Sequence, residues 1–330
     1  MAHFDSKNLK TLGVYASGGD APGMNAAIRA VVRTAILRNL RVVGIVQGYT
    51  GFLKKEFNEM ELRSVANIIQ RGGSILKAGR CPEFREAKYR KIAAENLRSF
   101  GIDGLICIGG DGSFTGANLL WQEQQIPVVG IPGTIDNDIY GTEYTIGFDT
   151  AVNTALDAID RIRDTAASHD RLFIIEVMGR ESGFIAVAAG LAGGAEDIFI
   201  PEHPFELKHT IELIKRGIAR GKMSSILVAA EGPKPGRAYD LADEIRKSSG
   251  LESKVCVLGH IQRGGAPTAM DRLLASRMGA KAVNEILHGQ CDIMIGVRGQ
   301  EMVTCELSDC LHKKKHVDHS LIELAKILSN

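Results

Sequence analysis

Carboxylates and glycines occur together where runs of apolar residues end. GGDGS at 109–113 follows the apolar run GLICI, and PGTIDND at 132–138 follows PVVGI. Glycine-rich turns that open a helix offer backbone N–H groups and the positive end of the helix dipole to anionic oxygens. An Asp inside such a turn repels bare phosphate, so Asp111 indicates a divalent cation between carboxylate and phosphate. These residues predict phosphate chemistry that uses a metal ion.

Four more turns of the same kind follow other apolar runs: GGDAPGMN (18–25), MGRESG (178–183), EGPKPG (231–236) and HIQRGG (260–265). A generic strand-to-helix turn explains any one of the six turns but is a poor explanation for all of them. No G-x-x-x-x-G-K-[ST] motif occurs, and Thr115 occupies the third glycine position of G-x-G-x-x-G. The chain is therefore predicted to be neither a Walker-type NTPase nor a standard dinucleotide-binding protein.

A phosphoryl transferase needs a metal ion, cationic groups and a residue that positions or deprotonates the attacking hydroxyl. Asp136 and Asp138 add two carboxylates to Asp111, and the other turns supply Arg and His. The six turns together therefore predict phosphoryl transfer.

Hydrophobic periodicity predicts the elements that position these turns. The expected strands are 11–17, 41–48, 104–110, 127–133, 171–179, 197–202, 224–232 and 255–260. One helix is expected to begin after residue 25 and another after residue 110. Further helices are expected at about 61–71, at about 85–100, at 206–220 and at 238–249. In the first of them Ile28, Val31, Val32 and Ala35 share one face. Alternating strands and helices indicate parallel sheets covered on both faces, with ligands at the carboxyl ends of the strands.

Composition limits the class of protein. The length of 330 residues suggests about two domains or one large α/β unit, and 45% hydrophobic with 24% charged residues is typical of a globular chain. A net charge of +1 gives no electrostatic reason to expect nucleic acid or an anionic membrane as a partner. The first ten residues lack the apolar segment of a signal peptide, and the apolar stretch at 184–195 is too short to span a bilayer. Six scattered cysteines without a C-x-x-C pair predict reduced thiols and a cytoplasmic location.

Five segments, in unbroken order, resemble the bacterial type of ATP-dependent 6-phosphofructokinase: GGDAPGMNAAIR (18–29), IGGDGS (108–113), PGTIDND, IEVMGR (175–180) and LGHIQRGG (258–265). The resemblance runs from about residue 11 to about residue 310. PGTIDND and GHIQRGG are highly specific, whereas GGDG also occurs in NAD and lipid kinases. The resemblance implies Mg²⁺-dependent transfer of the ATP γ-phosphoryl group to O1 of fructose 6-phosphate, the committing step of glycolysis.

The resemblance also implies an architecture and an assembly. We expect two Rossmann-like, three-layer α/β/α domains with mostly parallel sheets. Residues 1–146 plus 259–309 would form the ATP-binding domain, and 147–258 plus 310–330 the fructose 6-phosphate and effector domain. Members of the family are homotetramers.

Carried over position by position, Asp136 resembles the base for the 1-hydroxyl, and Arg180 a group that steadies the transferring phosphoryl. Asp111 and Asp138 resemble the Mg²⁺ carboxylates. The ATP-binding positions are Gly19, Arg80, Cys81, Gly110, Asp111, Gly112 and Ser113. The sugar-phosphate positions are Thr134, Ile135, Asp136, Arg171, Met178, Gly179, Arg180, Glu231, Lys254, His260, Ile261, Gln262 and Arg263.

Two of these positions imply a binding site that is shared between neighbouring subunits. Arg171 and Lys254 match family arginines that reach the 6-phosphate from a neighbouring subunit. Lysine at 254 keeps the charge but lacks the two-pronged guanidinium, so this contact is expected to be weaker than in the family.

Two glycines bear on the phosphoryl donor. Pyrophosphate-using relatives read GGDD and PKTIDND where this chain has Gly112 and Gly133. An Asp side chain at 112 would place bulk and charge where the nucleotide α-phosphate is expected, and a Lys at 133 would complement a small pyrophosphate. The two glycines favour ATP.

The family's effector site, which binds ADP or phosphoenolpyruvate between subunits, is matched in part. The matching residues are Arg29, Arg33, Arg163, Glu196, Arg220 and Lys222. A family arginine falls at Leu62, next to Arg63, and a family lysine falls at Met223. Arg29 and Arg33 are also compatible with an ordinary solvated helix face.

Other interpretations were open. A pyrophosphate-dependent phosphofructokinase, another GGDG kinase such as an NAD kinase, and a non-catalytic sugar-phosphate or nucleotide sensor share parts of the pattern. Cys305, Cys310, His312, His316 and His319 could suggest zinc, with the histidines spaced on a possible helix. A basic solvated tail around residues 313–315 accounts for them better, since the ligand spacing of a zinc finger is missing.

Overall fold

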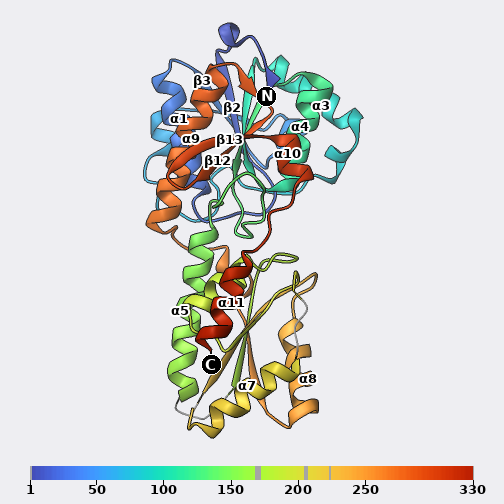
Figure 1. Ribbon diagram of the computed structural model, residues 1–330. Coiled ribbons are helices and arrows are strands. Elements are labelled where there is room, and N and C mark those ends of the chain that lie inside the picture. The colour runs from blue at the N-terminus through green and yellow to red at the C-terminus, as the bar shows by residue number, and fades with distance from the viewer. Residues whose placement is uncertain (1, 168–171, 204–206, 223, 330) are drawn as a thin grey trace. The chain divides into compact units, whose positions relative to one another are not determined.

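The computed structural model describes residues 2–167, 172–203, 207–222 and 224–329. The chain divides into two compact units, each with its own sheet (Figure 1). The first unit contains Met1–Ile135, Ile139–Asp149 and Arg263–Lys315. The second contains Asp136–Asp138, Thr150–Gln262 and His316–Asn330. Helices pack on both faces of both sheets, which confirms the predicted α/β class.

The first unit is built on a seven-stranded sheet with the order β13-β12-β6-β5-β2-β3-β4. The strands are β2 (Thr11–Ala16), β3 (Arg41–Ile45), β4 (Phe57–Met60), β5 (Gly104–Gly109), β6 (Val128–Pro132), β12 (Ile293–Arg298) and β13 (Glu301–Glu306). The central pairs are parallel, and β4 and β13 add antiparallel edges. A short antiparallel pair joins β1 (Ala2–His3) to β11 (Gln290–Cys291).

Helices cover both faces of this sheet. On one face α1 (Met24–Leu37) packs against α9 (Ala269–Leu287), and on the other lie α3 (Ala87–Ser99), α4 (Asp111–Gln124) and α10 (Leu307–His312) (Figure 1). The short α2 (Tyr49–Lys54) packs against α3. The predicted apolar face of α1 is confirmed, because its four residues are fully buried.

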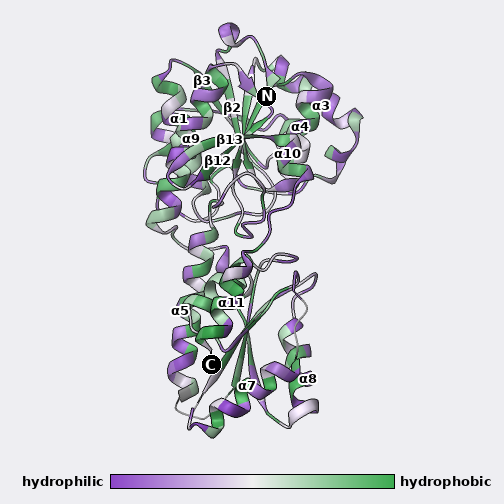
Figure 2. Ribbon diagram, viewed as in Figure 1, coloured by the Kyte–Doolittle hydropathy of each residue, from purple (hydrophilic) through white to green (hydrophobic). Residues whose placement is uncertain are grey.

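The second unit has a four-stranded, all-parallel sheet with the order β10-β7-β9-β8. The strands are β7 (Leu172–Val177), β8 (Asp197–Phe199), β9 (Ser225–Ala230) and β10 (Ser253–Val257). The helices are α5 (Phe148–Ala167), α6 (Phe184–Ala192), α7 (Leu207–Ala219), α8 (Arg237–Ser249) and α11 (His319–Leu328). Figure 2 shows that the strands of both sheets are largely hydrophobic, as expected for strands with two covered faces. Among the described residues, no helix has both the length and the apolar character needed to cross a bilayer.

The helix predicted at about 61–71 is wrong. This stretch instead begins with a 3-10 helix at Leu62–Val65 and continues as turns. The side chain of Asn25 holds the turns in place by donating to Arg71 O (3.0 Å) and accepting from Ile75 N (2.8 Å). These bonds compete with helical ones, so tertiary contacts outweigh the local preference.

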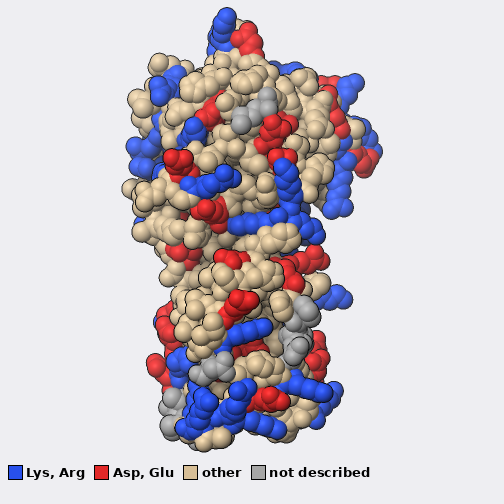
Figure 3. Space-filling view, in the orientation of Figure 1, with Lys and Arg blue, Asp and Glu red and all other residues tan. Residues whose placement is uncertain are grey.

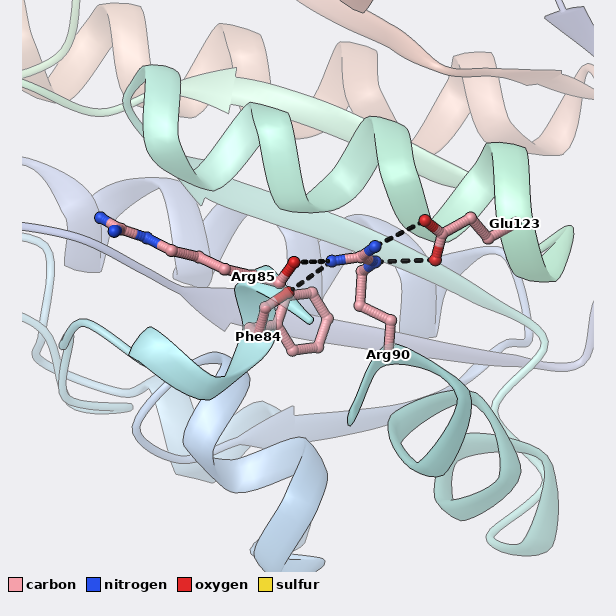
Figure 4. Close-up of polar contacts among 4 residues, drawn as sticks. All are labelled: Phe84, Arg85, Arg90 and Glu123. Atoms are coloured by element: carbon pink, nitrogen blue, oxygen red, sulfur yellow. Dashed lines mark hydrogen bonds and ion pairs between the residues drawn. The ribbon is translucent and has the colours of Figure 1, made fainter. Parts of the chain in front are cut away.

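A buried arginine links the segment after residue 81 to α3 and α4 (Figure 4). The Arg90 guanidinium donates to both carboxylate oxygens of Glu123, at 2.7 and 2.6 Å. Its Nη1 donates to Phe84 O (2.8 Å) and Arg85 O (2.7 Å). The Arg90 side chain is only 6% exposed, so its charge depends on these four acceptors.

Arg90→Met is expected to lower the free energy of unfolding by about 3 kcal/mol, the usual loss when one partner of a buried ion pair is removed. The hydrogen bond from Arg90 is the main reason why the pKa of Glu123 lies below its usual range. This stabilisation is present above the pKa of an unfolded glutamate and is lost as the pH falls through the folded-state pKa. Urea unfolding at neutral pH and near pH 4 would measure both effects, with a smaller difference between variant and wild type in acid.

Lys91→Met is the matched control, because Lys91 is exposed on the same helix. It should change stability by less than about 0.5 kcal/mol. Equal losses in the two variants would contradict the role assigned to Arg90.

Candidate active site

In the first unit, three predicted turns meet at one edge of the sheet. They follow β2, β5 and β6, which are parallel neighbours. The hydrogen-bond ladder continues past the strands, since Ser17 N donates to Ile108 O and Gly133 N donates to Gly109 O, both at 3.0 Å. These bonds fix the starting point of each turn, so the three turns form one surface.

The GGDGS turn forms the start of α4. Gly110 O accepts from Ser113 N (2.9 Å) and Phe114 N (3.0 Å), while Asp111 and Gly112 are exposed. A Cβ placed on Gly112 would meet no protein atom within 4 Å. The protein therefore leaves the space beside this helix N-terminus open for an anion.

The exposed carboxylate of Asp111 is a suitable ligand for Mg²⁺. Among the described residues, no three His, Cys, Asp or Glu side chains gather as a complete metal site. Mg²⁺ is commonly held by one or two carboxylates, with the substrate phosphates and water supplying the other ligands. Asp111 therefore fits Mg²⁺ that arrives with a phosphate.

Two buried tyrosines support this turn, and no pattern in the sequence indicates them. Tyr49 Oη donates to Ser113 O (2.5 Å), and Tyr15 Oη donates to Tyr49 Oη (3.1 Å). Burial is the main cause that raises the pKa of both phenols well above the usual value, so both stay neutral. A Cβ on Gly116 would lie 2.7 Å from the Tyr49 ring, which explains the glycine in this helix.

The remaining residues that are predicted to bind the nucleotide lie at the same edge of the sheet. Gly18 N donates to Gly79 O (3.1 Å), which holds the segment carrying the exposed Arg80 beside the first turn. Cys81 follows and is half-buried. A Cβ on Gly19 would lie 2.7 Å from Arg263 Nη1, and this nitrogen donates to Asp20 O (3.0 Å). Arg263, predicted for the sugar phosphate, thus lies in the first unit.

In the second unit, the ends of β7 and β9 bring carboxylates and an arginine together. Asp136 is 7% exposed, and its carbonyl accepts from Ser182 Oγ (2.9 Å). Arg180 N donates to Glu231 Oε1 (3.3 Å). The pKa of Glu231 is raised, mainly by burial and also by the negative charge of Asp136. Asp136, Arg180 and Glu231 therefore belong to one polar site.

The MGR turn after β7 has an unusual backbone. Gly179 has φ +139° and Arg180 has φ +55°, a left-handed conformation that few non-glycine residues adopt. A Cβ at 179 would lie 2.3 Å from Ser182 O, so only glycine fits there. Buried Gln262 stabilises the turn, because its Oε1 accepts from Met178 N (2.8 Å) and its Nε2 donates to Ala151 O (3.3 Å).

A model of the family described as Phosphofructokinase matches residues 11–286. The chain belongs to the phosphofructokinase family. It is 51% identical to the "ATP-dependent 6-phosphofructokinase" of Halothermothrix orenii and 54% identical to the "ATP-dependent 6-phosphofructokinase 1" of Thermus thermophilus. Each alignment covers 97% of this chain and 100% of the relative. The predicted resemblance is confirmed.

Solved structures agree with the family assignment. Phosphofructokinase from Saccharomyces cerevisiae is 37% identical with a TM-score of 0.85, over 92% of this chain and 45% of that chain. A pyrophosphate-dependent phosphofructokinase from Marinobacter aquaeolei is 26% identical with a TM-score of 0.82, over 94% of this chain and 86% of that chain. The chain therefore shares its fold with a phosphofructokinase that is described as pyrophosphate-dependent.

The other sugar-phosphate positions expected from the family differ in their exposure, and one lies outside the described residues. Lys254 lies on β10 at the edge of the second sheet, and His260 and Ile261 follow in a 3-10 helix; all three are exposed. Arg171 lies outside the described residues. Thr134 and Ile135 lie in the first unit, where Thr134 O accepts from Thr145 Oγ1 (2.6 Å).

Part of the effector set expected from the family lines one pocket of the second unit. Glu196, Arg220 and Lys222 surround a cavity of about 200 Å³, together with Arg216, which the motif comparison missed. Glu196 is buried and forms an ion pair with Lys222. Figure 3 shows Lys and Arg side chains gathered over α7, beside which this cavity lies.

The other proposed effector residues are distributed over both units. Arg163 donates to the carbonyls of Gly193 and Gly194 in the second unit. Arg29 and Arg33 lie on α1 in the first unit, and Leu62 is 50% exposed. Met223 lies outside the described residues.

The C-terminal histidines do not share the possible helix on which a zinc interpretation would rest. His312 ends α10, whereas His319 begins a separate helix, α11, after Asp318 accepts the capping hydrogen bond from Ser320 N (2.9 Å). The intervening segment, with residues 313–315, has no helical structure.

Proposed function

We propose that this chain is an ATP-dependent 6-phosphofructokinase that transfers the γ-phosphoryl group of ATP to O1 of D-fructose 6-phosphate. The observation that carries the proposal is identity above 50% with proteins of this name over their whole length. The paired sites described above, one suited to phosphate and one to a polar sugar, agree with it. The enzyme would act at the committing step of glycolysis in the cytoplasm.

The turns of the first unit would bind the nucleotide. The exposed N-terminus of α4 offers N–H groups to phosphate, and Arg80 adds a positive charge beside it. Asp111, with Asp138, would hold Mg²⁺, which neutralises phosphate charge when it is bound. Residues 1–146 plus 259–309 are the proposed ATP-binding domain, and the remainder is the proposed sugar-phosphate and effector domain.

The second set of turns would act on the acceptor. Asp136 would remove the proton of the 1-hydroxyl, and Arg180 would stabilise charge on the transferring group. Glu231 would accept hydrogen bonds from sugar hydroxyls, while His260, Arg263 and the partner subunit's Arg171 and Lys254 would bind the 6-phosphate. A homotetramer regulated by ADP or phosphoenolpyruvate is part of the proposal.

ATP is the proposed donor because of the open space at Gly112. Since no protein atom would meet a Cβ there, the fold itself does not require glycine at this position. The triphosphate of ATP would require the open space beside Gly112. At Gly133 a Cβ would touch Ile108 and Met24 at 3.0 and 3.1 Å, so packing contributes to that glycine.

Asp136→Asn is expected to lower kcat by about 10²–10⁴, the range of general-base losses. KM for fructose 6-phosphate should change far less, because Asn keeps the shape and the main-chain contact to Ser182. Steady-state kinetics with ATP and fructose 6-phosphate give both values, and an unchanged unfolding midpoint is the control. A variant that retains most of its kcat would remove Asp136 from the mechanism.

Gly112→Asp is expected to lower kcat/KM for ATP by about tenfold or more, since like charges near a protein surface repel by several kcal/mol at about 4 Å. Gly112→Asn is the matched control for bulk without charge and should lose less. Wild-type protein should give negligible turnover with pyrophosphate. Pyrophosphate turnover comparable to that with ATP would overturn the donor assignment.

Lys254→Arg should leave kcat nearly unchanged and tighten fructose 6-phosphate binding by up to about 1 kcal/mol, because a guanidinium makes more fixed hydrogen bonds than an ammonium. Lys254→Ala should weaken binding by about tenfold. At a low concentration of fructose 6-phosphate, mixed Asp136→Asn and Lys254→Ala subunits should give more activity than the sum of the two separate variants, because hybrids contain sites with both groups intact. A site shared between subunits would be excluded if the mixtures gained no activity and Lys254→Ala bound fructose 6-phosphate as tightly as wild type.

A further inference from the structure

Two cysteines outside the proposed active site lie together at one end of the first sheet. Cys305 lies on β13 and pairs with Met294 of β12, and Cys310 lies on α10. Cys310 Sγ is 4.0 Å from Met294 Sδ. Cys305 Sγ packs so closely on Gly141 that a Cβ there would lie 2.7 Å from it. Both thiols therefore lie around the side chain of Met294.

The two thiols differ in their access to solvent. Cys310 is 3% exposed, whereas Cys305 is half-buried and lines a cavity of about 680 Å³. Lys281 and Arg298 line the same cavity together with Glu285, Glu306 and Asp309, and Lys281 is ion-paired with Glu285. A small, polar oxidant can therefore reach Cys305 but not Cys310.

The two thiols also differ in the direction of their pKa shifts. A hydrogen bond from Cys310 is the main reason why the pKa of Cys305 lies below its usual value, whereas the same contact and burial raise the pKa of Cys310. The other four thiols all have raised pKa values, Cys107 and Cys291 to about 12, chiefly through burial. Thiolate is the reactive form of cysteine, and Cys305 also lines the cavity, so Cys305 is better placed than the buried Cys310 to react with an oxidant.

We propose that Cys305 and Cys310 form a reversible oxidation site for hydroperoxides, with Cys305 as the nucleophile and Cys310 as the resolving thiol. The Cys305 thiolate attacks one peroxide oxygen, the O–O bond breaks, and the products are a sulfenic acid and hydroxide. Cys310 sulfur then attacks the sulfenic sulfur and forms the disulfide. The displaced hydroxide takes the Cys310 proton and leaves as water, so two thiols and one peroxide give a disulfide and two waters.

This site is connected to α4, whose first turn holds Asp111. Helix α10 packs directly on α4, and the charge of Asp111 is one of the causes that raise the pKa of Cys310. A disulfide with Cys305 would draw Cys310 toward β13 and would therefore alter the packing of α10 on α4. Oxidation is therefore expected to raise KM for ATP several-fold, an effect that rests on the proposed function.

Peptide mapping tests the site without any activity measurement. The full-length protein is treated with hydrogen peroxide, alkylated and cut with trypsin after Arg298 and Lys313, which gives a peptide with only these two cysteines. The peptide should be lighter by two hydrogen atoms and unalkylated, and thiol reductant should restore double alkylation. In Cys310→Ser, dimedone should label Cys305. The proposal would be overturned if this peptide were doubly alkylated in protein whose Cys256 had been oxidised. It would also be overturned if dimedone labelled Cys310 in Cys305→Ser.

Kinetics test the connection to α4 separately. KM for ATP should rise on oxidation in wild type and in the control Cys256→Ser, a half-buried thiol on β10, and should stay constant in Cys305→Ser and Cys310→Ser. A disulfide that leaves KM unchanged would overturn the connection. Protein without phosphofructokinase activity would refute the proposed function, and the mapping would still decide the oxidation site.

Discussion

The extension of the sheet hydrogen bonds beyond the strands is the constraint on which both sites depend. In the first unit the bonds from Ser17 and Gly133 continue the ladder past β2 and β6. In the second unit Glu231 N donates to Val177 O (2.9 Å), and Leu258 N donates to Glu176 O (3.0 Å). A parallel ladder fixes the register of its strands, so each turn begins at a defined height. The functional groups are therefore positioned by backbone bonds before any ligand binds.

Buried polar side chains then hold the turns that leave the ladder. Gln262 is fully buried and holds the MGR turn, and Asn25 holds the segment that leads to Arg80. Glu176 accepts from Gly236 N and Ala238 N, both at 2.8 Å, at the start of α8. Each buried group would cost free energy without its partners, so these bonds favour one loop conformation over others. The left-handed backbone at Arg180 is maintained by such surroundings.

Sequence could predict the features that depend on local pattern. Apolar strands followed by glycine and carboxylate predicted both sheets, and the order of the motifs predicted the family. The predicted helix at 61–71 failed because Asn25, distant in sequence, supplies the competing hydrogen bonds. Tyr49 was missed because its role depends on the fold, which brings its hydroxyl to Ser113. Contacts between distant segments leave no periodic signal, whereas strand ends do.

The second unit gathers three carboxylates, Asp136, Glu176 and Glu231, beside the turn proposed to bind an anionic sugar phosphate. Glu176 is compensated by two N–H groups at the start of α8, where the helix dipole also favours negative charge. Glu231 has one weaker bond, from Arg180 N at 3.3 Å, and burial together with the charges of Asp136 and Glu176 raises its pKa. Its carboxylate is therefore protonated at a higher pH than that of an ordinary glutamate. Sugar hydroxyls that donate to Glu231 would stabilise its negative charge. A bare phosphate would instead add a further negative charge beside the three carboxylates. In the proposed function, this arrangement would favour a sugar that carries a phosphate over phosphate alone.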